Sequence, residues 1–385
     1  MTEERFEPGP IFLLTSMLTV TFLSRMLLSP LLLQIRAHYE LTHSQAGSLF
    51  LVISVGYSIS VLLSGFVSQR LLHRDTVLLS VVVTGAAVAV LGFAPPAPLF
   101  IAALALVGVG AGLYAPSGIA MLTDVVRSRD WGKALAIHEM GPILGFFAAP
   151  VLANVGLRFF GWRLPFLIVA AVSVLVAALF FRRARGGRIP GAPPSPRNVL
   201  AIWSIGRFWV IATFFVLAVG LEIGVYSMLP AFLVEERGIA EEFANTLVSI
   251  SRLSALPLVF TSGWLADRIG SRALILTVAM VAGSATITIG IAGGVALSIA
   301  VLLQPMFVAA FFPAGLIELA RVAPAERRNL TVSLVIPVAN LFGAGAVPAL
   351  LGYLAERGSF GAGFVAVGLL MPAATVLLKL LPDRR

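Results

Sequence analysis

The chain has 385 residues, of which 59% are hydrophobic and only 12% are charged, and its mean hydropathy is +0.99. Soluble domains carry about 25% charged residues, so this composition excludes a soluble fold and predicts a protein whose solvent is lipid. The sequence has no cysteine, which excludes disulfides and thiolate metal sites, and its four histidines show no metal-ligand spacing. The net charge of +9 comes from basic residues in short loops, so we expect no nucleic-acid partner.

Twelve apolar stretches long enough to span a membrane follow one another along the chain. The first six lie at about 11–33, 45–70, 76–94, 99–122, 132–155 and 164–181, and the second six at about 206–233, 244–266, 273–293, 296–320, 330–353 and 360–379. The segment between the two sets is rich in Pro, Gly and Arg, which predicts a flexible cytoplasmic linker. We therefore predict an all-α membrane protein with two pseudo-symmetric six-helix bundles, at residues 1–181 and 201–385, joined by a linker at 182–200.

The two halves repeat each other at a spacing of 197 or 198 residues. Gly65, Pro116, Gly118, Gly145 and Pro150 in the first half recur as Gly263, Pro313, Gly315, Gly343 and Pro348 in the second. This pattern predicts an ancient duplication. In membrane proteins, parallel repeats of this size are typical of carriers whose two bundles rock against each other.

Basic residues predict the orientation of the chain in the membrane. With the N-terminus inside, twenty of the 27 Lys and Arg fall in cytoplasmic loops, five fall in outer loops, and Arg25 and Arg252 lie within spans. Short cytoplasmic loops are enriched in Lys and Arg, so we predict that both termini are cytoplasmic. We expect a monomeric, multi-pass protein of the cytoplasmic (inner) membrane.

The loop after the eighth span carries a specific motif. Residues 263–272 are Gly-Trp-Leu-Ala-Asp-Arg-Ile-Gly-Ser-Arg, which resembles the loop signature G-x-L-a-D-r-x-G-r/k of the major facilitator superfamily. The first-half counterpart at 65–74 is degraded, with Gln69 where the family has Asp. The resemblance covers the whole chain, because the twelve spans, the long central loop and the repeat all fit. It implies the family's fold and transport by alternating access.

Charges at such a loop can pair in one conformation of a carrier and separate in another, because an exposed pair contributes only about 0–1 kcal/mol. We therefore predict a conformational gate at this loop, made of Gly263, Asp267, Arg268, Gly270 and Arg272. The alternative is that these charges only fix the topology.

Five ionisable residues within predicted spans are the candidates for transport chemistry. They are Arg25, His138, Glu139, Glu222 and Arg252. An ionisable residue in a span costs about 2.5–3.5 kcal/mol and usually faces the bundle interior or a water-filled cavity. A guanidinium offers a planar fork of donors that suits a carboxylate, sulfonate or phosphate. We predict that the two arginines bind an anionic substrate, and the alternative is that Glu222 or Glu139 neutralises them.

Polar residues accompany both arginines at helical spacing. Arg25 shares a stripe with Thr21 and Ser29, and Arg252 shares one with Asn245 and Ser249. We include Ser249 in the predicted substrate site. Further polar groups within spans, which orient a ligand or only pack, are Tyr114, Tyr226 and Asn340, together with Tyr57 and Gln304.

Three acid or base groups are candidates for proton coupling. Glu222 lies one turn before Tyr226 and falls within about one turn of the depth of Arg25 across the pseudo-twofold axis. An arginine that binds or releases substrate would shift the protonation of such a carboxylate; the alternative is a fixed ion pair. His138 is a candidate proton relay, but it is about 100° from Glu139 on a helix, so the two cannot face the same place. A histidine that only packs is the alternative.

Two narrower resemblances point to different functions. An arginine in the eighth span, here Arg252, resembles the arrangement in oxalate/formate exchangers and monocarboxylate transporters, which implies a substrate carboxylate at this residue. In the fifth span, Gly141-Pro142-Ile143-Leu144-Gly145 resembles part of the exporter signature G-x-x-x-G-P-x-x-G. With residues 113–118, it also resembles the fosmidomycin-resistance exporters.

We therefore predict a secondary active transporter that works by alternating access and moves a small organic anion, a carboxylate, by proton-coupled transport. The alternative is a proton-coupled efflux antiporter for drugs or metabolites. We expect a small-molecule substrate, the proton as coupling ion, a surrounding lipid bilayer and no cofactor. We predict that the chain is not an enzyme, because it carries no acid/base dyad, nucleophile constellation, metal site or phosphate loop at usable spacing.

Overall fold

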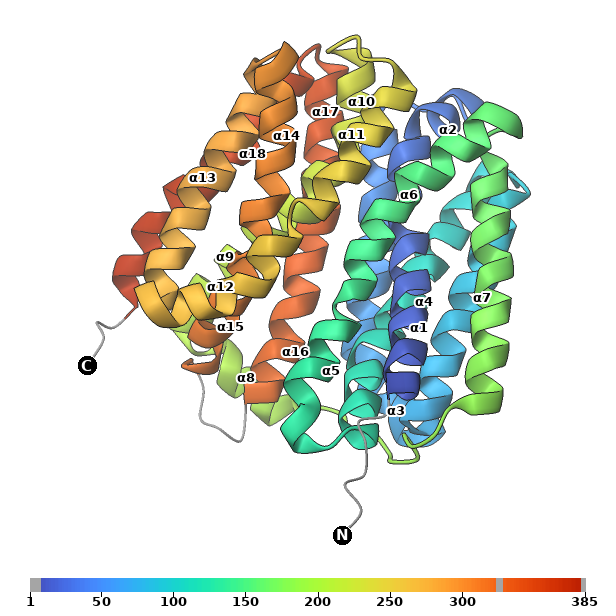
Figure 1. Cartoon of the computed structure of the whole chain (residues 1–385), viewed down its shortest axis with the longest axis vertical. Helices are drawn as coiled ribbons and strands as arrows, with labels where there is room; N and C mark the ends of the chain where they lie inside the picture. The colour runs from blue at the N-terminus through green and yellow to red at the C-terminus, as the bar shows by residue number, and fades with distance from the viewer. Residues whose placement is uncertain (1–7, 323–327, 382–385) are drawn as a thin grey trace. The chain divides into compact units, whose positions relative to one another are not determined.

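The computed structural model describes residues 8–322 and 328–381 of the chain (Figure 1). Every regular element over these residues is helical, and eleven of the helices there are long and apolar enough to cross a membrane. One of the eleven, α3 (His43–Gly92), merges two helices across a non-helical break at Leu72. It therefore accounts for both the second and the third predicted span. The predicted all-α membrane class is confirmed.

The remaining elements follow in chain order. The first half contains α1 (Pro8–Met26), η1 (Ser29–Leu31), α2 (Leu32–His38), α4 (Ala97–Val125), η2 (Ser128–Asp130), α5 (Trp131–His138), α6 (Met140–Phe159) and α7 (Arg163–Arg183). The second half contains α8 (Pro196–Trp203), α9 (Gly206–Val219), η3 (Gly220–Gly224), α10 (Val225–Glu235), α11 (Glu241–Leu253), α12 (Leu256–Ile269), α13 (Ser271–Ile291), α14 (Gly294–Ala309), α15 (Phe311–Ala320), α16 (Arg328–Ala339), η5 (Asn340–Ala346), α17 (Val347–Glu356), α18 (Phe360–Ala374) and η6 (Thr375–Leu380). The segments η3 and η5 are π-helical.

Packing divides the chain into two compact units. Unit 1 consists of Met1–Leu28 and Val55–Pro193, and unit 2 consists of Ser29–Ser54 and Pro194–Arg385. Unit 2 therefore includes α2 and the beginning of α3, which belong to the first half of the sequence. The bundle boundaries proposed from the sequence, 1–181 and 201–385, stay a prediction.

Four helices end four residues before a proline. They are α1, which ends before Pro30, α5 before Pro142, α11 before Pro257 and α14 before Pro313. Proline has no N–H to donate to the carbonyl four residues earlier, and its ring clashes with that carbonyl. The helix therefore stops at that residue. Pro116 and Pro150 lie inside α4 and α6 without ending them.

Two repeated glycines let helices approach closely. A Cβ atom on Gly145 would lie 2.9 Å from Phe22 Cδ1 and 3.1 Å from the Leu23 nitrogen of α1. A Cβ atom on Gly343 would lie 2.5 Å from the Val216 carbonyl oxygen of α9. Only a residue without a side chain fits at either position, so each half packs its fifth span against its first through a glycine.

A second pair of repeated glycines makes room for an aromatic ring on its own helix. A Cβ atom on Gly118 would lie 2.6 Å from the ring of Tyr114, and one on Gly315 would lie 2.8 Å from the ring of Phe311. Tyr114 and Phe311 are themselves 197 residues apart. The repeat therefore preserves packing geometry, whereas the chemistry at the repeated positions differs.

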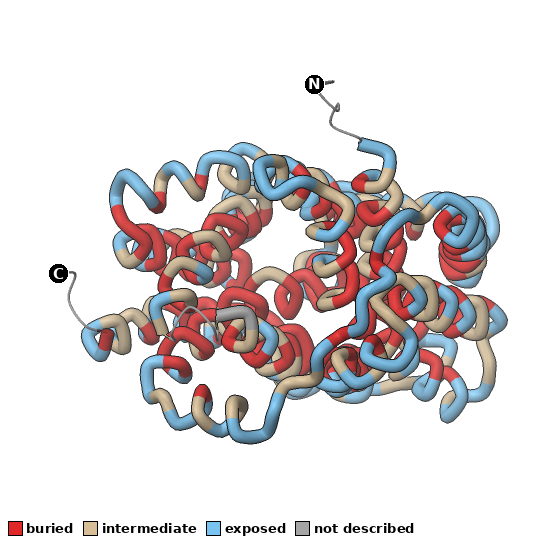
Figure 2. Tube along the Cα trace, turned by 90° about the horizontal axis from the view of Figure 1, so that it is seen from below, coloured by how far each residue is buried: buried red, intermediate tan, exposed pale blue. Residues whose placement is uncertain are grey.

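The outer faces of the helices are apolar. Figure 2 shows buried and exposed stretches alternating along the helices. On α7, Phe166 and Phe180 are fully buried, whereas Val174 is 69% exposed and Leu175 is 58% exposed. A helix that is hydrophobic on every side suits a membrane span, because lipid rather than water covers its outer face.

We predict that Gly145→Ala and Gly343→Ala each lower the free energy of unfolding by about 1–3 kcal/mol, because the added methyl group overlaps backbone atoms of a neighbouring helix. Thermal unfolding in detergent measures the effect. Gly132→Ala in α5 is the control, because a Cβ atom there meets nothing within 4 Å. Equal unfolding temperatures for all three variants would contradict the close packing.

Candidate functional site

Unit 1 holds Arg25 against an aromatic ring. Arg25 lies in the last turn of α1 and is 5% exposed. Its guanidinium carbon lies 4.1 Å from the centroid of the Tyr57 ring on α3 and 5.8 Å from that of Phe22. Stacking of this kind stabilises a desolvated guanidinium by about 2 kcal/mol or more. Sequence reasoning had named Tyr57 only as a general polar group, because one sequence does not give helix rotation.

The predicted stripe around Arg25 is interrupted. Thr21 is buried, and its hydroxyl donates to the carbonyls of Met17 and Leu18 at 3.1 and 3.0 Å. Ser29 lies beyond the end of α1, in η1, and donates to the Tyr226 carbonyl at 2.8 Å within unit 2. The cause is the break before Pro30, which separates Ser29 from the α-helical spacing of Arg25.

Unit 2 holds Arg252 in a similar way. Arg252 on α11 is 3% exposed, and its guanidinium carbon lies 4.7 Å from the centroid of the Tyr226 ring on α10. Its Nη1 atom donates to the backbone carbonyl of Glu222 at 3.5 Å. Ser249 and Asn245, one and two turns earlier on α11, are buried. The structure thus brings together three predicted site residues, Arg252, Tyr226 and Glu222.

The π-helical segment η3 supplies carbonyl oxygens to this arrangement. Gln304 on α14 donates from Nε2 to the Leu221 carbonyl at 2.7 Å, next to the Glu222 carbonyl that accepts from Arg252. A π turn disturbs the regular hydrogen-bond ladder, and such turns are frequent at functional sites. The other predicted amide, Asn340 at the start of η5, donates to the Ile336 carbonyl of its own helix at 3.2 Å.

His138 and Tyr114 form a second buried pair in unit 1. The Tyr114 hydroxyl lies 2.7 Å from the Leu14 carbonyl and 2.9 Å from His138 Nε2, and the two rings are stacked with an interplanar angle of 10°. His138 is 2% exposed and ends α5, four residues before Pro142. The proline break thus places a titratable ring at a helix end inside a span.

The hydrogen bonds at Tyr114 fix the tautomer of His138. A carbonyl only accepts, so the single hydroxyl hydrogen of Tyr114 goes to Leu14 and the His138 Nε2–H must donate to the hydroxyl oxygen. In the neutral ring Nδ1 is then a bare acceptor, and it lies 3.4 Å from Glu139 Oε1. A hydrogen bond between these two atoms requires a proton on one of them, because both are acceptors without it. The two side chains approach at this atom pair, but the His138 side chain is 2% exposed and that of Glu139 is 58% exposed, so they still face different surroundings.

The predicted gate loop in unit 2 has a backbone turn that requires glycine. Gly270 has φ +92°, and Arg268 lies over the Trp264 ring at 5.2 Å from its centroid. Asp267 is exposed, and a Cβ atom on Gly263 would meet nothing within 4 Å. In unit 1 the position equivalent to Gly270 is Leu72, which has φ +65°. A non-glycine residue held there is strained by about 1–3 kcal/mol.

A buried carboxylate next to the gate loop escaped sequence reasoning. Glu318 on α15 is 4% exposed, accepts a hydrogen bond from the Ser271 hydroxyl, and lies 2.6 Å from Arg321 Nη1 and 3.8 Å from Arg272 Nε. The signal was present, because Glu318 falls inside the predicted span at 296–320. The Glu318 carboxylate links Arg272 of the gate loop to α15 by an ion pair.

Part of the predicted flexible linker is held in place on unit 1. The carbonyls of Gly187 and Ile189 accept hydrogen bonds from the N–H groups of Arg74 and His73 at 3.0 and 3.2 Å. The Gly191 N–H donates to the Ser68 carbonyl at 3.1 Å. Residues 187–191 thus form a strap over the first-half loop at 65–74, and the flexibility expected of the linker stays a prediction.

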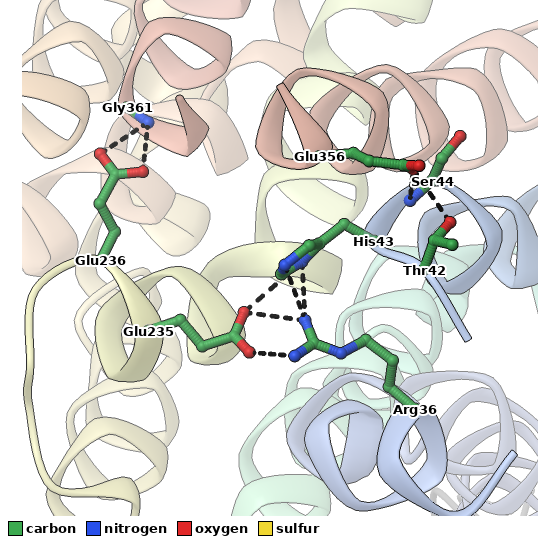
Figure 3. Close-up of polar contacts among 8 residues, drawn as sticks. All are labelled: Arg36, Thr42, His43, Ser44, Glu235, Glu236, Glu356 and Gly361. Carbon is green, nitrogen blue, oxygen red and sulfur yellow. Dashed lines mark hydrogen bonds and ion pairs between the residues drawn. The ribbon is translucent and has the colours of Figure 1, made fainter. Parts of the chain in front are cut away.

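A polar cluster in unit 2 attaches the first-half segment Ser29–Ser54 to second-half helices (Figure 3). Arg36 Nη2 lies 2.6 Å from Glu235 Oε1 on α10, and His43 Nδ1 lies 3.6 Å from Glu235 Oε2. Glu356 on α17 accepts from the Thr42 hydroxyl at 2.9 Å and from a neighbouring backbone N–H. Close glycine packing supports the cluster, because a Cβ atom on Gly47 or Gly352 would overlap backbone carbonyl oxygens.

Comparison with known sequences identifies one family. The sequence profile of the Major Facilitator Superfamily matches residues 14–250 and 221–385. The niacin transporter NiaP of Acinetobacter baylyi is 21% identical over 275 residues, 61% of each chain. The probable 4-methylmuconolactone transporter of Cupriavidus pinatubonensis is 26% identical over 65% of this chain and 60% of its own. The probable sulfoacetate transporter SauU of Cupriavidus necator is 25% identical over 71% of this chain and 67% of its own.

The chain thus matches about 60% of the length of the first two of these relatives. Among solved structures, a bacterial homologue of the human lysosomal transporter Spinster, in an inward-facing and occupied conformation, resembles this fold with a TM-score of 0.78. The similarity covers 98% of this chain and 96% of that one, at 17% identity. At this identity the likeness establishes the fold alone.

We predict that Glu318→Ala lowers the free energy of unfolding by about 1–3 kcal/mol, because it leaves the Ser271 hydroxyl and Arg272 without the buried carboxylate, whereas the half-exposed Arg321 regains water. Thermal unfolding in detergent checks it against Glu242→Ala, which removes an exposed carboxylate on α11. A Glu318→Ala protein as stable as the control would show that the cluster contributes little.

Proposed function

Because the chain belongs to the Major Facilitator Superfamily, we propose that it is a secondary active transporter that moves a small organic anion by proton-coupled alternating access. The family assignment confirms the resemblance of the 263–272 loop. It also makes the chain an integral, multi-pass membrane protein. The named relatives are transporters, which agrees with the prediction that the chain is not an enzyme. We place the protein in the cytoplasmic membrane as a monomer with both termini inside, and treat 1–181 and 201–385 as the two bundles.

The buried arginine of unit 2 carries the proposal. Arg252 is desolvated, and its flat face rests on Tyr226. Its N–H donors lie in the guanidinium plane and point away from the ring face, so stacking does not consume them. A carboxylate or sulfonate in that plane would gain a bidentate, charge-assisted contact. Niacin and sulfoacetate, named for two of the relatives, both carry such a group.

Arg25 is the second proposed anion contact, because it has the same stacked geometry in unit 1. Ser249 and Asn340 are further polar residues of the proposed substrate site, and Tyr114 and Tyr226 are its aromatic residues. In the transport cycle, the loop residues Gly263, Asp267, Arg268, Gly270 and Arg272 form the proposed gate. The polar cluster that holds Ser29–Ser54 must then open when the carrier changes conformation.

His138 and Glu139 are the proposed proton site. A proton that binds at Nδ1 of His138 turns this nitrogen and Glu139 Oε1, which lie 3.4 Å apart, into a hydrogen-bonded pair. The 58% exposed side chain of Glu139 gives this proton a path to water, whereas the ring itself is buried. Glu222 is the second candidate, because its backbone is beside Arg252 and its charge would respond to an anion bound there.

We predict that Arg252→Ala lowers uptake into proteoliposomes by about 30-fold or more, since losing one partner of a buried charged contact costs at least about 2 kcal/mol. Radiolabelled nicotinate and sulfoacetate under an imposed proton gradient are the probes. Arg357→Ala is the matched control, because Arg357 stacks on Tyr353 at 4.3 Å but is exposed. If Arg25→Ala and Arg252→Ala both transport like the unaltered protein, the anion site is wrong.

We predict that His138→Gln lowers the substrate accumulation driven by a proton gradient by about tenfold or more. The rate of substrate exchange at equal pH on both sides should stay within about twofold of that of the unaltered protein. Glutamine retains a donor for Tyr114 but cannot bind the proton. Accumulation and exchange are measured on the same proteoliposomes, with His38→Gln, an exposed position, as the control. Unchanged accumulation by His138→Gln would remove His138 from the proton path and leave Glu222→Gln as the next variant to measure.

A further inference from the structure

A groove lies between the beginning of α1 and the end of α7, both in unit 1. Its volume is about 820 Å³, which falls within the usual range for small-molecule sites. The lining residues are Pro8, Gly9, Pro10, Phe12, Leu13, Ser16, Leu179, Arg182, Arg183, Ala184 and Arg185. Both helix ends are at the bottom of Figure 1. The groove is separate from Arg25, Arg252 and His138.

The groove combines a basic rim with an apolar wall. Arg182, Arg183 and Arg185 are exposed, and none of the lining residues within the described range 8–322 is acidic. The apolar wall includes Phe12, which is 60% exposed, and Leu179, which is 37% exposed. A binding partner therefore needs a negative charge at one end and hydrocarbon at the other.

The backbone around the rim fixes the arginines at the end of α7. Gly186 and Gly187 have φ +71° and +67° and turn the chain away from the helix. The Gly187 N–H donates to Asp124 Oδ2 at 2.7 Å, and Arg74 Nη2 donates to the Phe181 carbonyl at 3.0 Å. Asp124 is thereby engaged by the backbone, and it does not line the groove.

We propose that this groove binds an anionic membrane phospholipid, with its phosphate at the three arginines and its acyl chains along the apolar faces of α1 and α7. The apolar wall continues into spans whose outer faces are hydrophobic, as Val174 and Leu175 demonstrate on α7. A soluble phosphate compound would leave that wall exposed. Basic pockets between spans at the membrane surface suit anionic headgroups, because each arginine there contributes attraction to the phosphate.

The experiment titrates dioleoylphosphatidylglycerol into the purified full chain in detergent and records the thermal unfolding midpoint and the bound lipid by native mass spectrometry. Dioleoylphosphatidylcholine and sn-glycerol 3-phosphate are the comparison ligands. We expect phosphatidylglycerol to remain bound and to raise the midpoint, with neither comparison ligand doing so. The triple variant R182Q/R183Q/R185Q should bind phosphatidylglycerol with an affinity lower by about tenfold or more.

A matched variant, R127Q/R129Q/K133Q, removes the same charge from the segment between α4 and the first turn of α5 in unit 1. Its affinity for phosphatidylglycerol should stay within about twofold of that of the unaltered chain. Equal weakening in both triple variants, or none in R182Q/R183Q/R185Q, would overturn the proposal. So would equal binding of sn-glycerol 3-phosphate, which would make the groove a site for soluble anions. Phe12→Ser should weaken the binding of phosphatidylglycerol, because it removes part of the apolar wall.

The acidic N-terminal residues Glu3, Glu4 and Glu7 are the competing occupants, since they precede Pro8 in the sequence. A variant that lacks residues 2–7 separates the two cases. Phosphatidylglycerol binding that is the same with and without these residues supports the lipid. Binding that develops only after their removal would assign the groove to the chain's own N-terminal segment and overturn the proposal.

Discussion

The hydrocarbon core of a bilayer accepts and donates no hydrogen bonds, so every polar group of this protein that faces it needs a partner from the protein itself. Hydroxyl groups meet this constraint by donating to the preceding turn of their own helix, as Thr15 does to Ile11 and Ser227 does to Ile223. A guanidinium is too large for that solution. Arg25 and Arg252 are instead held against tyrosine rings from neighbouring helices, and this requirement fixes which faces of those helices meet.

The same constraint explains where the helices are irregular. A break or a π turn releases backbone carbonyls, which are costly in hydrocarbon unless a side chain reaches them. In unit 2 the carbonyls of Leu221 and Glu222 accept from Gln304 and Arg252. The irregular segment and the buried polar side chains therefore stabilise each other. The candidate site lies at η3 for a physical reason, because the carbonyls that the π turn displaces accept from these buried donors.

The sequence predicted the spans, the repeat and the family, because these depend on residue type and spacing alone. It also predicted Arg252, Tyr226 and Glu222 individually, since a charge or tyrosine in an apolar span is conspicuous. It did not predict that Tyr57 lies on Arg25, that Glu318 joins Arg272, or that His138 Nδ1 approaches Glu139 Oε1. These contacts depend on helix rotation and on breaks four residues before a proline. The breaks at Pro30 and Pro142 were recoverable from a rule about proline, whereas the rotations were not.

The two halves share backbone features at equivalent positions, but their polar and charged side chains stand at different positions. In unit 1 the arginine is on the first span and the tyrosine on the second, whereas in unit 2 the tyrosine precedes the arginine. The loop that follows the second span in each half bends at equivalent positions, but Gly270 suits that bend and Leu72 is strained in it. Unit 1 also lacks the aspartate of the loop motif. The carbonyls of its linker strap accept hydrogen bonds from the N–H groups of His73 and Arg74, just after the strained residue. In unit 2, α13 begins directly after Gly270, and the Leu274 N–H donates to the Gly270 carbonyl. The strap therefore stabilises a bend that the first-half sequence no longer favours.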